Sequence, residues 1–275
     1  MKVKLWEKNL LKKSLNMFYL FLSAVAVFLS FVDLDARFKV IILALVVILS
    51  FLYHIYKWKK VNNLSQVNLK INNSDLEIKF GDIFDEESNK LIPMNEYYDT
   101  TFENRLISRT SIHGQLLDKM TNDEIAELDK ELEDQSLNHL VEDNLERPNG
   151  KIRKFDLGTI IIYKKYFLLA LTHFNNDNEA ELTMNEYVRC LLNMWKNIDK
   201  HYNGETICIP LLGSGQTRMR DNTTISDSEL LDIMIWTFRI SKVKFTYPSK
   251  MKIILLPEKK DKFNLFKIKE DNYGV

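Results

Sequence analysis

Two apolar runs dominate the first sixty residues. Residues 15–32 contain no charged side chain, and residues 40–56 form a second such run. Each run is close to the shortest helix that crosses a bilayer core of roughly 30 Å. Apolar side chains cover every helical face, which distinguishes these runs from amphipathic surface helices. The pattern predicts a transmembrane hairpin over residues 1–60, with helices at about 15–32 and 39–57. A buried pair in a soluble protein and a cleaved signal peptide are the weaker alternatives.

The charges that flank the two runs predict an orientation. Five lysines precede the first run and three follow the second, whereas the connection DLDARFK holds as many acidic as basic side chains. Positive charge collects on the cytoplasmic side of a membrane. We therefore expect a multi-pass protein with both termini in the cytoplasm. Small residues at positions 23, 24, 26 and 30 are compatible with self-association of the helices.

The remainder of the chain has the pattern of one α/β domain, residues 61–275. Short alternating or continuous apolar runs predict strands, and longer runs of helical period predict helices that cover them. The expected strands are 68–71, 75–80, 90–94, 158–163, 166–174, 206–212 and 252–257, and the expected helices are 115–120, 179–202 and 226–240. Pro210 counts against the strand at 206–212, because proline lacks a ladder donor.

An acidic segment interrupts this domain at about residues 121–150. Ile125, Leu128, Leu132 and Leu137 recur at roughly helical spacing, so one or two surface helices are expected. Thr121 with Glu124 has the spacing of a capping box. The acidic run is interpreted as a solvated face, and a lid or oligomer contact is the alternative.

Polar residues follow the predicted strands at several points. Asp82 and Ile83 follow the strand at 75–80, Asn95 follows 90–94 with Asp99 close behind, and SIHGQ at 111–115 opens a helix. Such an aspartate is more often a cap or turn former than a ligand contact. His113 alone is more often a packing residue than a base.

A glycine loop follows the apolar run at 207–212. Gly213, Ser214 and Gly215 are followed by Gln216, Thr217 and Arg218. Ligands of α/β proteins bind where strands end in such loops, and successive backbone N–H groups can form an anion site. Arg218 would add a fixed positive charge. A phosphate site and an unliganded tight turn both fit these residues.

Composition excludes some classes of function. The chain has 38 basic and 38 acidic residues, and the lack of a basic excess argues against a general nucleic-acid binder. Cys190 and Cys208 cannot form a disulfide framework and are expected to be buried thiols. No CxxC or His/Cys cluster suggests a metal site.

Taken in order, the motifs resemble the macro domain family. GDI after an early strand, a strand that ends in asparagine, a Ser-x-His-Gly loop and IPLLGSG after a late strand follow that family's order over about residues 68–257. With NEYYDT, SIHGQ, DLGTIIIY and LLALTHF, the chain looks like the macro domain of Thoeris anti-phage effectors, and the hairpin looks like their membrane-anchored form. The resemblance implies a mixed sheet flanked by helices in a protein of the bacterial inner membrane.

The resemblance also implies a site for ADP-ribose or a conjugate derived from NAD. Asp82 would read the adenine amino group with Ile83 beside the ring, and Asn95 would lie near the distal ribose. The implied ligand-binding residues are Asp82, Ile83, Asn95, Asp99, Ser111, His113, Gly114, Gln115, Leu212, Gly213, Ser214, Gly215, Gln216, Thr217 and Arg218. The common VNxAN stretch is replaced by IPMNEYYDT and the glycine-rich first loop by SIHGQ, so the regions on which hydrolytic members depend are altered.

Three functions remain open. The first is a sensor without catalytic residues, metal or cofactor. It would bind a nucleotide made by a partner TIR-domain enzyme, form homo-oligomers and disrupt the membrane lipid, causing abortive infection. The second is a membrane-tethered ADP-ribosyl or O-acyl-ADP-ribose hydrolase that uses Asn95, Asp99 and His113. The third is a passive scaffold. The sequence favours the sensor, because a nucleotide site is fused to a bare hairpin.

Overall fold

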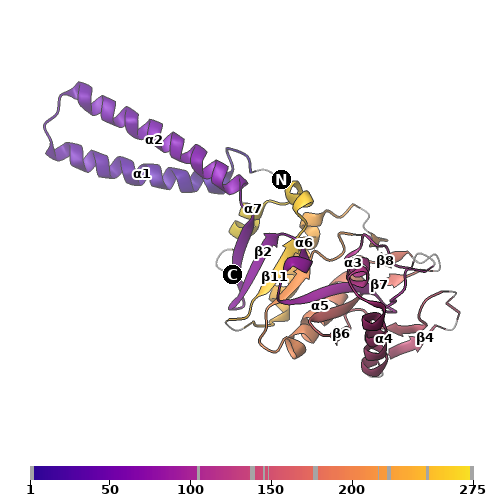
Figure 1. The fold of residues 1–275 in the computed structure, drawn as a ribbon. Helices are drawn as coiled ribbons and strands as arrows, with labels where there is room; N and C mark the ends of the chain where they lie inside the picture. The colour runs from indigo at the N-terminus through magenta and orange to yellow at the C-terminus, as the bar shows by residue number, and fades with distance from the viewer. Residues whose placement is uncertain are drawn as a thin grey trace. The chain divides into compact units, whose positions relative to one another are not determined.

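The computed structural model describes residues 3–103, 106–136, 140–144, 146–147, 149–175, 179–215, 217–221, 224–245 and 248–272 (Figure 1). The chain forms two compact units. One contains the N-terminal hairpin and the last helix of the chain, and the other is built from Asn68–Lys262. Each is described by itself.

The hairpin consists of α1 (Lys8–Phe31) and α2 (Ala36–Asn62), both longer than the sequence predicts. Most of the extra residues lie at the ends remote from the connection, where lysines continue each helix beyond its apolar run, and α2 also begins three residues earlier than predicted, at Ala36. At 1.5 Å per residue the helices are about 36 and 40 Å long, enough for a bilayer core. Both helices are long and apolar enough to be candidate membrane spans. Only 11% of the apolar 18-residue stretch of each helix is buried within the protein.

The open end of the hairpin is closed by hydrogen bonds to the N-terminal segment. The amide of Val3 donates to Asn62 Oδ1 at 2.7 Å, and Trp58 Nε1 donates to the carbonyl of Val3 at 2.8 Å. The His54 ring is buried, with Nδ1 2.8 Å from Ser14 Oγ and Nε2 2.9 Å from the carbonyl of Leu5. His54 therefore ties both helices to this segment.

A short C-terminal helix that the sequence analysis did not predict, α7 (Leu265–Asp271), completes this unit. Its Phe266 packs with Val3 and Leu10 in a small apolar cluster. Lys13 reaches Glu270 at 2.6 Å and lies over the Phe266 ring. The helix α7 is thus fixed to the base of the hairpin.

The second unit contains a mixed sheet. Its strands are β1 (Gln66–Ile71), β2 (Ser74–Phe80), β3 (Asn89–Asn95), β6 (Ile160–Tyr163), β7 (Tyr166–Phe174), β8 (Ala180–Leu182), β9 (Ile207–Pro210), β10 (Arg218–Met219) and β11 (Met251–Leu255). The order is β1-β2-β11-β9-β3-β7-β8-β10, with β6 also paired to β7. Pairing is parallel from β2 to β7, while β6 and β8 run antiparallel to β7. This is the mixed sheet that the sequence predicts.

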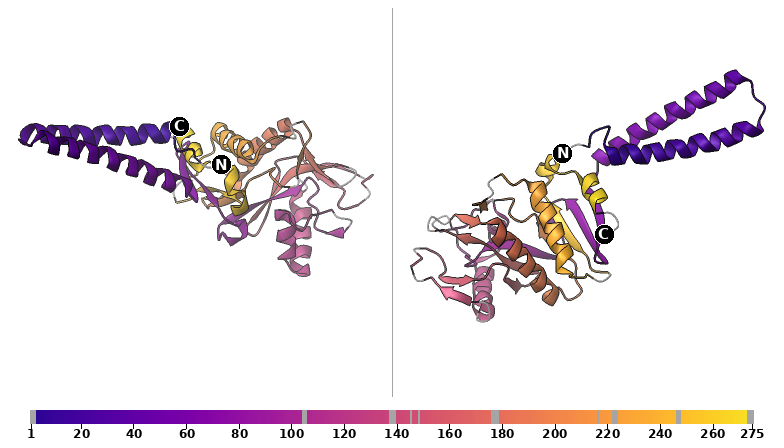
Figure 2. Two further views of the ribbon diagram at one scale, coloured as in Figure 1. Left: turned by 90° about the horizontal axis from the view of Figure 1, so that it is seen from above. Right: turned by 180° about the vertical axis from the view of Figure 1, so that it is seen from behind.

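Helices cover both sides of this sheet (Figure 2). On one side lie α5 (Met184–His201) and α6 (Asp227–Ser241), which contact each other, and on the other lies α4 (Asn122–Ser136). Both α5 and α6 begin with complete capping boxes, from Thr183 and Ser226 respectively. Their first turns are therefore fixed by local sequence.

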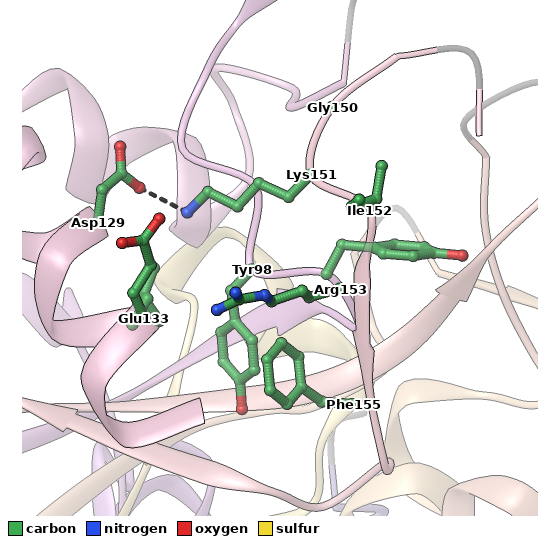
Figure 3. A pocket seen from close by; sticks show the side chains of 10 residues that line it. Tyr98, Asp129, Glu133, Gly150, Lys151, Ile152, Arg153 and Phe155 are labelled. Atoms are coloured by element: carbon green, nitrogen blue, oxygen red, sulfur yellow. Dashed lines mark hydrogen bonds and ion pairs between the residues drawn. The ribbon is translucent and has the colours of Figure 1, made fainter. Parts of the chain in front are cut away.

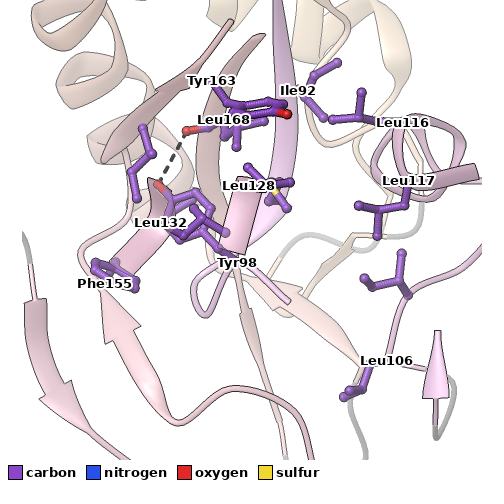
Figure 4. Close-up of a cluster of buried hydrophobic side chains, with 14 residues drawn as sticks. Ile92, Tyr98, Leu106, Leu116, Leu117, Leu128, Leu132, Phe155, Tyr163 and Leu168 are labelled. Atoms are coloured by element: carbon purple, nitrogen blue, oxygen red, sulfur yellow. Dashed lines mark hydrogen bonds between the residues drawn. The ribbon is translucent and has the colours of Figure 1, made fainter. Parts of the chain in front are cut away.

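The core on the α4 side joins strands and helices that are distant in sequence (Figure 4). Ile92 of β3 and Leu168 of β7 are fully buried with Leu116 of α3 (Ile112–Asp118) and Leu128 of α4. The Tyr98 hydroxyl donates to the carbonyl of Thr159 at 2.8 Å, so this cluster also holds the loop after β3. The core thereby fixes the loop that carries several predicted site residues.

Pro210 is accommodated at the end of β9. β3 pairs with β9 only through Ile207 and Cys208, so no β3 ladder bond is lost at the proline. Both cysteines are buried free thiols, as expected. Burial raises the pKa of both thiols to about 12.

The acidic insert differs from the prediction in its second half. α4 begins as predicted, since Glu124 accepts from the amide of Thr121 at 3.1 Å. After it, β4 (Leu140–Asp143) pairs antiparallel with β5 (Arg153–Phe155) instead of forming a second helix. The amide of Phe155 donates to the carbonyl of Glu96, an attachment that the helical period of the insert could not reveal. Leu137, which that period included, lies outside the described residues.

Candidate functional site

A cavity of about 220 Å³ lies at the carboxyl ends of β3, β9 and β11. In open α/β sheets this is the edge at which ligands bind. Nine of the residues expected in the site line it: Asn95, Ser111, His113, Gln115, Leu212, Gly213, Ser214, Gly215 and Thr217. The two loops that the sequence places far apart therefore meet in one cleft.

Three hydrogen bonds to its carbonyl groups fix the conformation of the glycine loop. The carbonyl of Leu211 accepts from Ser214 Oγ at 2.9 Å, and that of Leu212 accepts from the Tyr187 hydroxyl at 3.0 Å. The carbonyl of Ser214 accepts from Lys259 Nζ at 2.7 Å. In a trans peptide the next N–H points the opposite way. The amide of Gly213 thus points away from the buried Tyr187 hydroxyl, as an anion site in the cavity requires, whereas the amide of Gly215 points away from Lys259.

Two glycines in this loop have different roles. Gly213 has φ +78°, and an added Cβ would lie 3.0 Å from Met219 Cε, so the turn itself requires glycine. At Gly215 an added Cβ would meet nothing within 4 Å. Gly215 is thus not needed for packing, and it faces open space where a ligand can approach.

The first loop is shaped by Ser111 and Gly114. Ser111 caps α3, since its Oγ accepts from the amide of Gly114 at 3.0 Å. An added Cβ at Gly114 would collide with the carbonyl of Ser108. Gly114 is buried and does not line the cavity, so its requirement for glycine comes from close packing of α3 on residues 108–109.

His113 lies in the wall of the cavity and is 6% exposed. Burial lowers the pKa of its imidazole to about 4, despite a hydrogen bond to the backbone of Asp99. Its Nε2 has no hydrogen-bond partner among the described residues. The ring is therefore neutral at pH 7. A general base works best with a pKa near the working pH, so this pKa does not suit catalysis at neutral pH.

Asn95 and Asp99 are bonded to each other and to the surrounding backbone. Asn95 Nδ2 donates to Asp99 Oδ2 at 2.8 Å, and Asn95 Oδ1 accepts from the amide of Tyr97 at 3.0 Å. Asp99 is fully buried and accepts two hydrogen bonds from Arg147, at 3.0 and 2.7 Å. Asp99 does not line the cavity. A ligand contact from either side chain stays a prediction.

Four further expected residues, besides Gly114 and Asp99, lie elsewhere or are not described. Asp82 is exposed and caps the short 3-10 helix η1 (Ile83–Asp85), while Ile83 is buried, and neither lines the cavity. Arg218 also lies outside its lining, and its guanidinium is 2.5 Å from Glu179. Gln216 lies outside the described residues.

The residue that the sequence analysis missed is Lys259. It lies in η3 (Pro257–Lys262), just after β11, and lines the cavity with Leu256. Among the described residues that line the cavity, Lys259 carries the only charged side chain. The basic run that follows the predicted strand at 252–257 was the available signal, because the end of that strand lies beside the glycine loop.

A larger cavity of about 400 Å³ lies between α4 and β5 (Figure 3). Its wall includes Tyr98, Phe155 and the pair formed by Lys151 Nζ and Asp129 Oδ1 at 2.5 Å. None of the expected ligand-binding residues lines it. Among the described residues, no group of three or more His, Cys, Asp or Glu side chains is arranged to hold a metal ion.

Comparison with known sequences identifies a family. The model of the family described as "Thoeris protein ThsA, Macro domain" matches residues 76–256. The chain is 38% identical over 268 residues to a Thoeris protein ThsA of Bacillus amyloliquefaciens (strain Y2), covering 96% of this chain and 90% of that protein. The match therefore includes the hairpin as well as the macro domain.

Comparison with solved structures confirms the fold. A macrodomain from Oceanobacillus iheyensis, solved with ADP, is similar with a TM-score of 0.52 and 16% identity, covering 76% of this chain and 98% of that one. A mutant of the same macrodomain, solved with ADPR, gives a TM-score of 0.50 and 18% identity, with 74% and 97% covered. At this identity the similarity establishes the macro fold alone.

Proposed function

This chain belongs to the ThsA family of Thoeris proteins, and we propose that its macro domain is a sensor for an ADP-ribose-type nucleotide. The observation that carries the proposal is the cleft at 211–215 and 111–115. Its glycine loop is held so that the backbone N–H group of Gly213 is available for a diphosphate, and Lys259 supplies the positive charge. The same fold in the Oceanobacillus protein was solved with ADP and with ADPR, which supports a nucleotide in this cleft.

The signal is a product that a partner TIR-domain enzyme makes from NAD. Binding favours an assembled form of the protein, and the hairpins then disrupt the inner membrane and arrest the infected cell. The two candidate spans at the N-terminus support the membrane part of this proposal. Thermodynamics sets one requirement: the nucleotide must bind the assembled state more tightly than the resting state, because equal affinity shifts no equilibrium.

A sensor fits the cleft better than a hydrolase does. Asn95 and Asp99 are engaged with each other, and Asp99 is also paired with Arg147. The pKa of His113 is about 4, far below the value that favours proton transfer at neutral pH. The three side chains that a hydrolase would use are therefore occupied by structural bonds or poorly matched to acid–base catalysis.

The test is calorimetric titration of the full-length protein in detergent. ADP-ribose and the product mixture of a TIR enzyme acting on NAD are the two titrants, and the ligand is recovered afterwards for chromatography. A sensor binds the TIR product more tightly than ADP-ribose and returns it intact. Turnover of the recovered ligand would identify a hydrolase instead, and binding of neither titrant would refute the nucleotide site.

The variant Gly215→Ala sharpens this test. The added methyl group meets no protein atom within 4 Å, so the thermal stability of the variant should equal that of the wild type. The methyl group enters the space where the ligand approaches, so affinity for the TIR product should fall. Unchanged affinity would place the ligand elsewhere.

A further inference from the structure

The cavity has an electrostatic feature that the glycine loop does not explain. Lys259 is the only charged side chain among the described residues that line it. Its Nζ donates to the carbonyl of Ser214 at 2.7 Å and lies 3.3 Å from Asp227 Oδ2. The side chain is 20% exposed, so the ammonium group is largely withdrawn from solvent yet open to the cavity. A nucleotide diphosphate bound here would meet one positive charge and no carboxylate from these lining residues.

Asp227 does not depend on Lys259 alone. It lies in the first turn of α6 and is 9% exposed, so an unpaired carboxylate there would be costly. Lys262 Nζ lies 2.9 Å from the same Oδ2 atom, closer than Lys259. If Lys259 moves to another anion, Lys262 still neutralises Asp227. Two lysines facing one carboxylate leave one positive charge in excess at the edge of the cavity.

The ammonium group can serve the loop and a ligand together. A lysine has three donors, and one of them is used by the carbonyl of Ser214. A phosphate held by the amide of Gly213 would lie on the same short loop that Lys259 already contacts. Rotation of the flexible side chain would bring a second donor to such a phosphate without breaking the first bond.

We propose that Lys259 is a ligand-binding residue of the cleft, which leaves Asp227 to Lys262 and donates to a phosphate group of the bound nucleotide. This rests on the proposed function. It gives Lys259 the role that the sequence analysis expected of Arg218. Arg218 is two-thirds exposed, lies outside the cavity lining and is paired with Glu179.

Three variants of the full-length protein in detergent test this assignment. Lys259→Met removes the charge and keeps the length of the side chain, and Lys259→Arg keeps the charge. Lys260→Met is the matched control: Lys260 belongs to the same η3 segment, but it lies over the Phe80 ring and does not line the cavity. Each protein is titrated with ADP-ribose, with ADP and with adenosine, at low and high salt.

The assignment predicts a loss that depends on the phosphates. Lys259→Met should weaken the binding of ADP-ribose and ADP at least about tenfold and leave the affinity for adenosine unchanged, as expected for the loss of one charge-assisted hydrogen bond. It should also flatten the dependence of affinity on salt, because one ion contact is gone. Lys259→Arg should recover most of the affinity, and Lys260→Met should behave as the wild type.

Two results would overturn the assignment while the proposed function stands. One is ADP-ribose affinity in Lys259→Met within twofold of the wild type. The other is an equal loss for adenosine and ADP-ribose, which would mean that Lys259 only supports the shape of the loop. If the wild type binds neither ADP-ribose nor the TIR product, the proposed function fails and the assignment fails with it.

Discussion

Asp99 and Arg147 form a buried ion pair in which both carboxylate oxygens accept from the guanidinium. Arg147 Nη1 lies 3.0 Å from Asp99 Oδ1, and Nη2 lies 2.7 Å from Oδ2. The Arg147 side chain is 5% exposed and stacks over the Tyr97 ring at 3.8 Å, while Asp99 is fully buried. The pair therefore joins the loop after β3 to the insert, 48 residues later.

Loss of one partner of this pair should be strongly destabilising. Arg147→Met leaves the Asp99 carboxylate buried without its cation, and we expect a loss of about 3–5 kcal/mol in the free energy of unfolding. Thermal or chemical denaturation of the full-length protein in detergent measures it. Asp118→Asn is the matched control. It breaks the exposed pair of Arg109 with Asp118 and should cost less than about 1 kcal/mol. Equal effects of the two substitutions would contradict the structural role of Arg147.

The two glycines of the ligand loop should respond differently to alanine. Gly213→Ala puts a side chain at φ +78° and a methyl group 3.0 Å from Met219 Cε, so a loss of about 1–3 kcal/mol is expected. Gly215→Ala meets nothing within 4 Å and should leave the unfolding midpoint unchanged. Differential scanning calorimetry of both variants checks the contrast. A destabilised Gly215→Ala protein would mean that the loop packs more closely than the structure shows.

Acid should destabilise the protein through His113. Its pKa is about 4 in the folded state and about 6.5 in an unfolded chain. Between these values the unfolded state binds more protons, so stability falls as the pH falls, by about 3 kcal/mol over the whole window. His173 titrates in the opposite sense, because Glu96 raises its pKa.

The His113 effect is measured as a difference between two proteins. The free energy of unfolding is recorded from pH 7 to pH 4 for the wild type and for His113→Gln, so that contributions shared by both, including that of His173, cancel. The wild type should lose about 3 kcal/mol more than the variant over this range. Parallel curves would show that His113 is accessible to solvent in the folded state.

The bonds at the base of the hairpin predict slow exchange at one amide. The amide of Val3 donates to Asn62 Oδ1, and Asn62 Nδ2 also reaches the carbonyl of Val3 at 3.3 Å. Asn62→Ala removes both bonds, so hydrogen exchange in the N-terminal segment should accelerate by tenfold or more. Exchange followed by mass spectrometry of the full-length protein tests this. Asn63→Ala, at the C-cap of α2, is the control and should leave exchange of the N-terminal segment unchanged.

Local sequence determined most of the elements and their order. The apolar runs predicted the two candidate spans, and short apolar segments predicted the strands that build the sheet. Thr121 with Glu124 predicted the start of α4, because a capping box is made by residues three positions apart. Gly213 predicted the loop after β9, because a turn with positive φ selects glycine. Such signals are short-range and therefore visible in the chain itself.

Only the tertiary structure decided which polar groups are available to a ligand. Asp99 looked available in the sequence, yet Arg147 occupies its carboxylate. Arg218 looked like the phosphate cation, yet it pairs with Glu179, while Lys259 reaches Ser214 from 45 residues away. The second half of the insert contains the strand β4 instead of a helix, and its partner β5 is bonded to the loop after β3 through the amide of Phe155. A contact between residues far apart in the chain leaves no periodic pattern, so burial and pairing emerge only when the sheet brings its strand ends together.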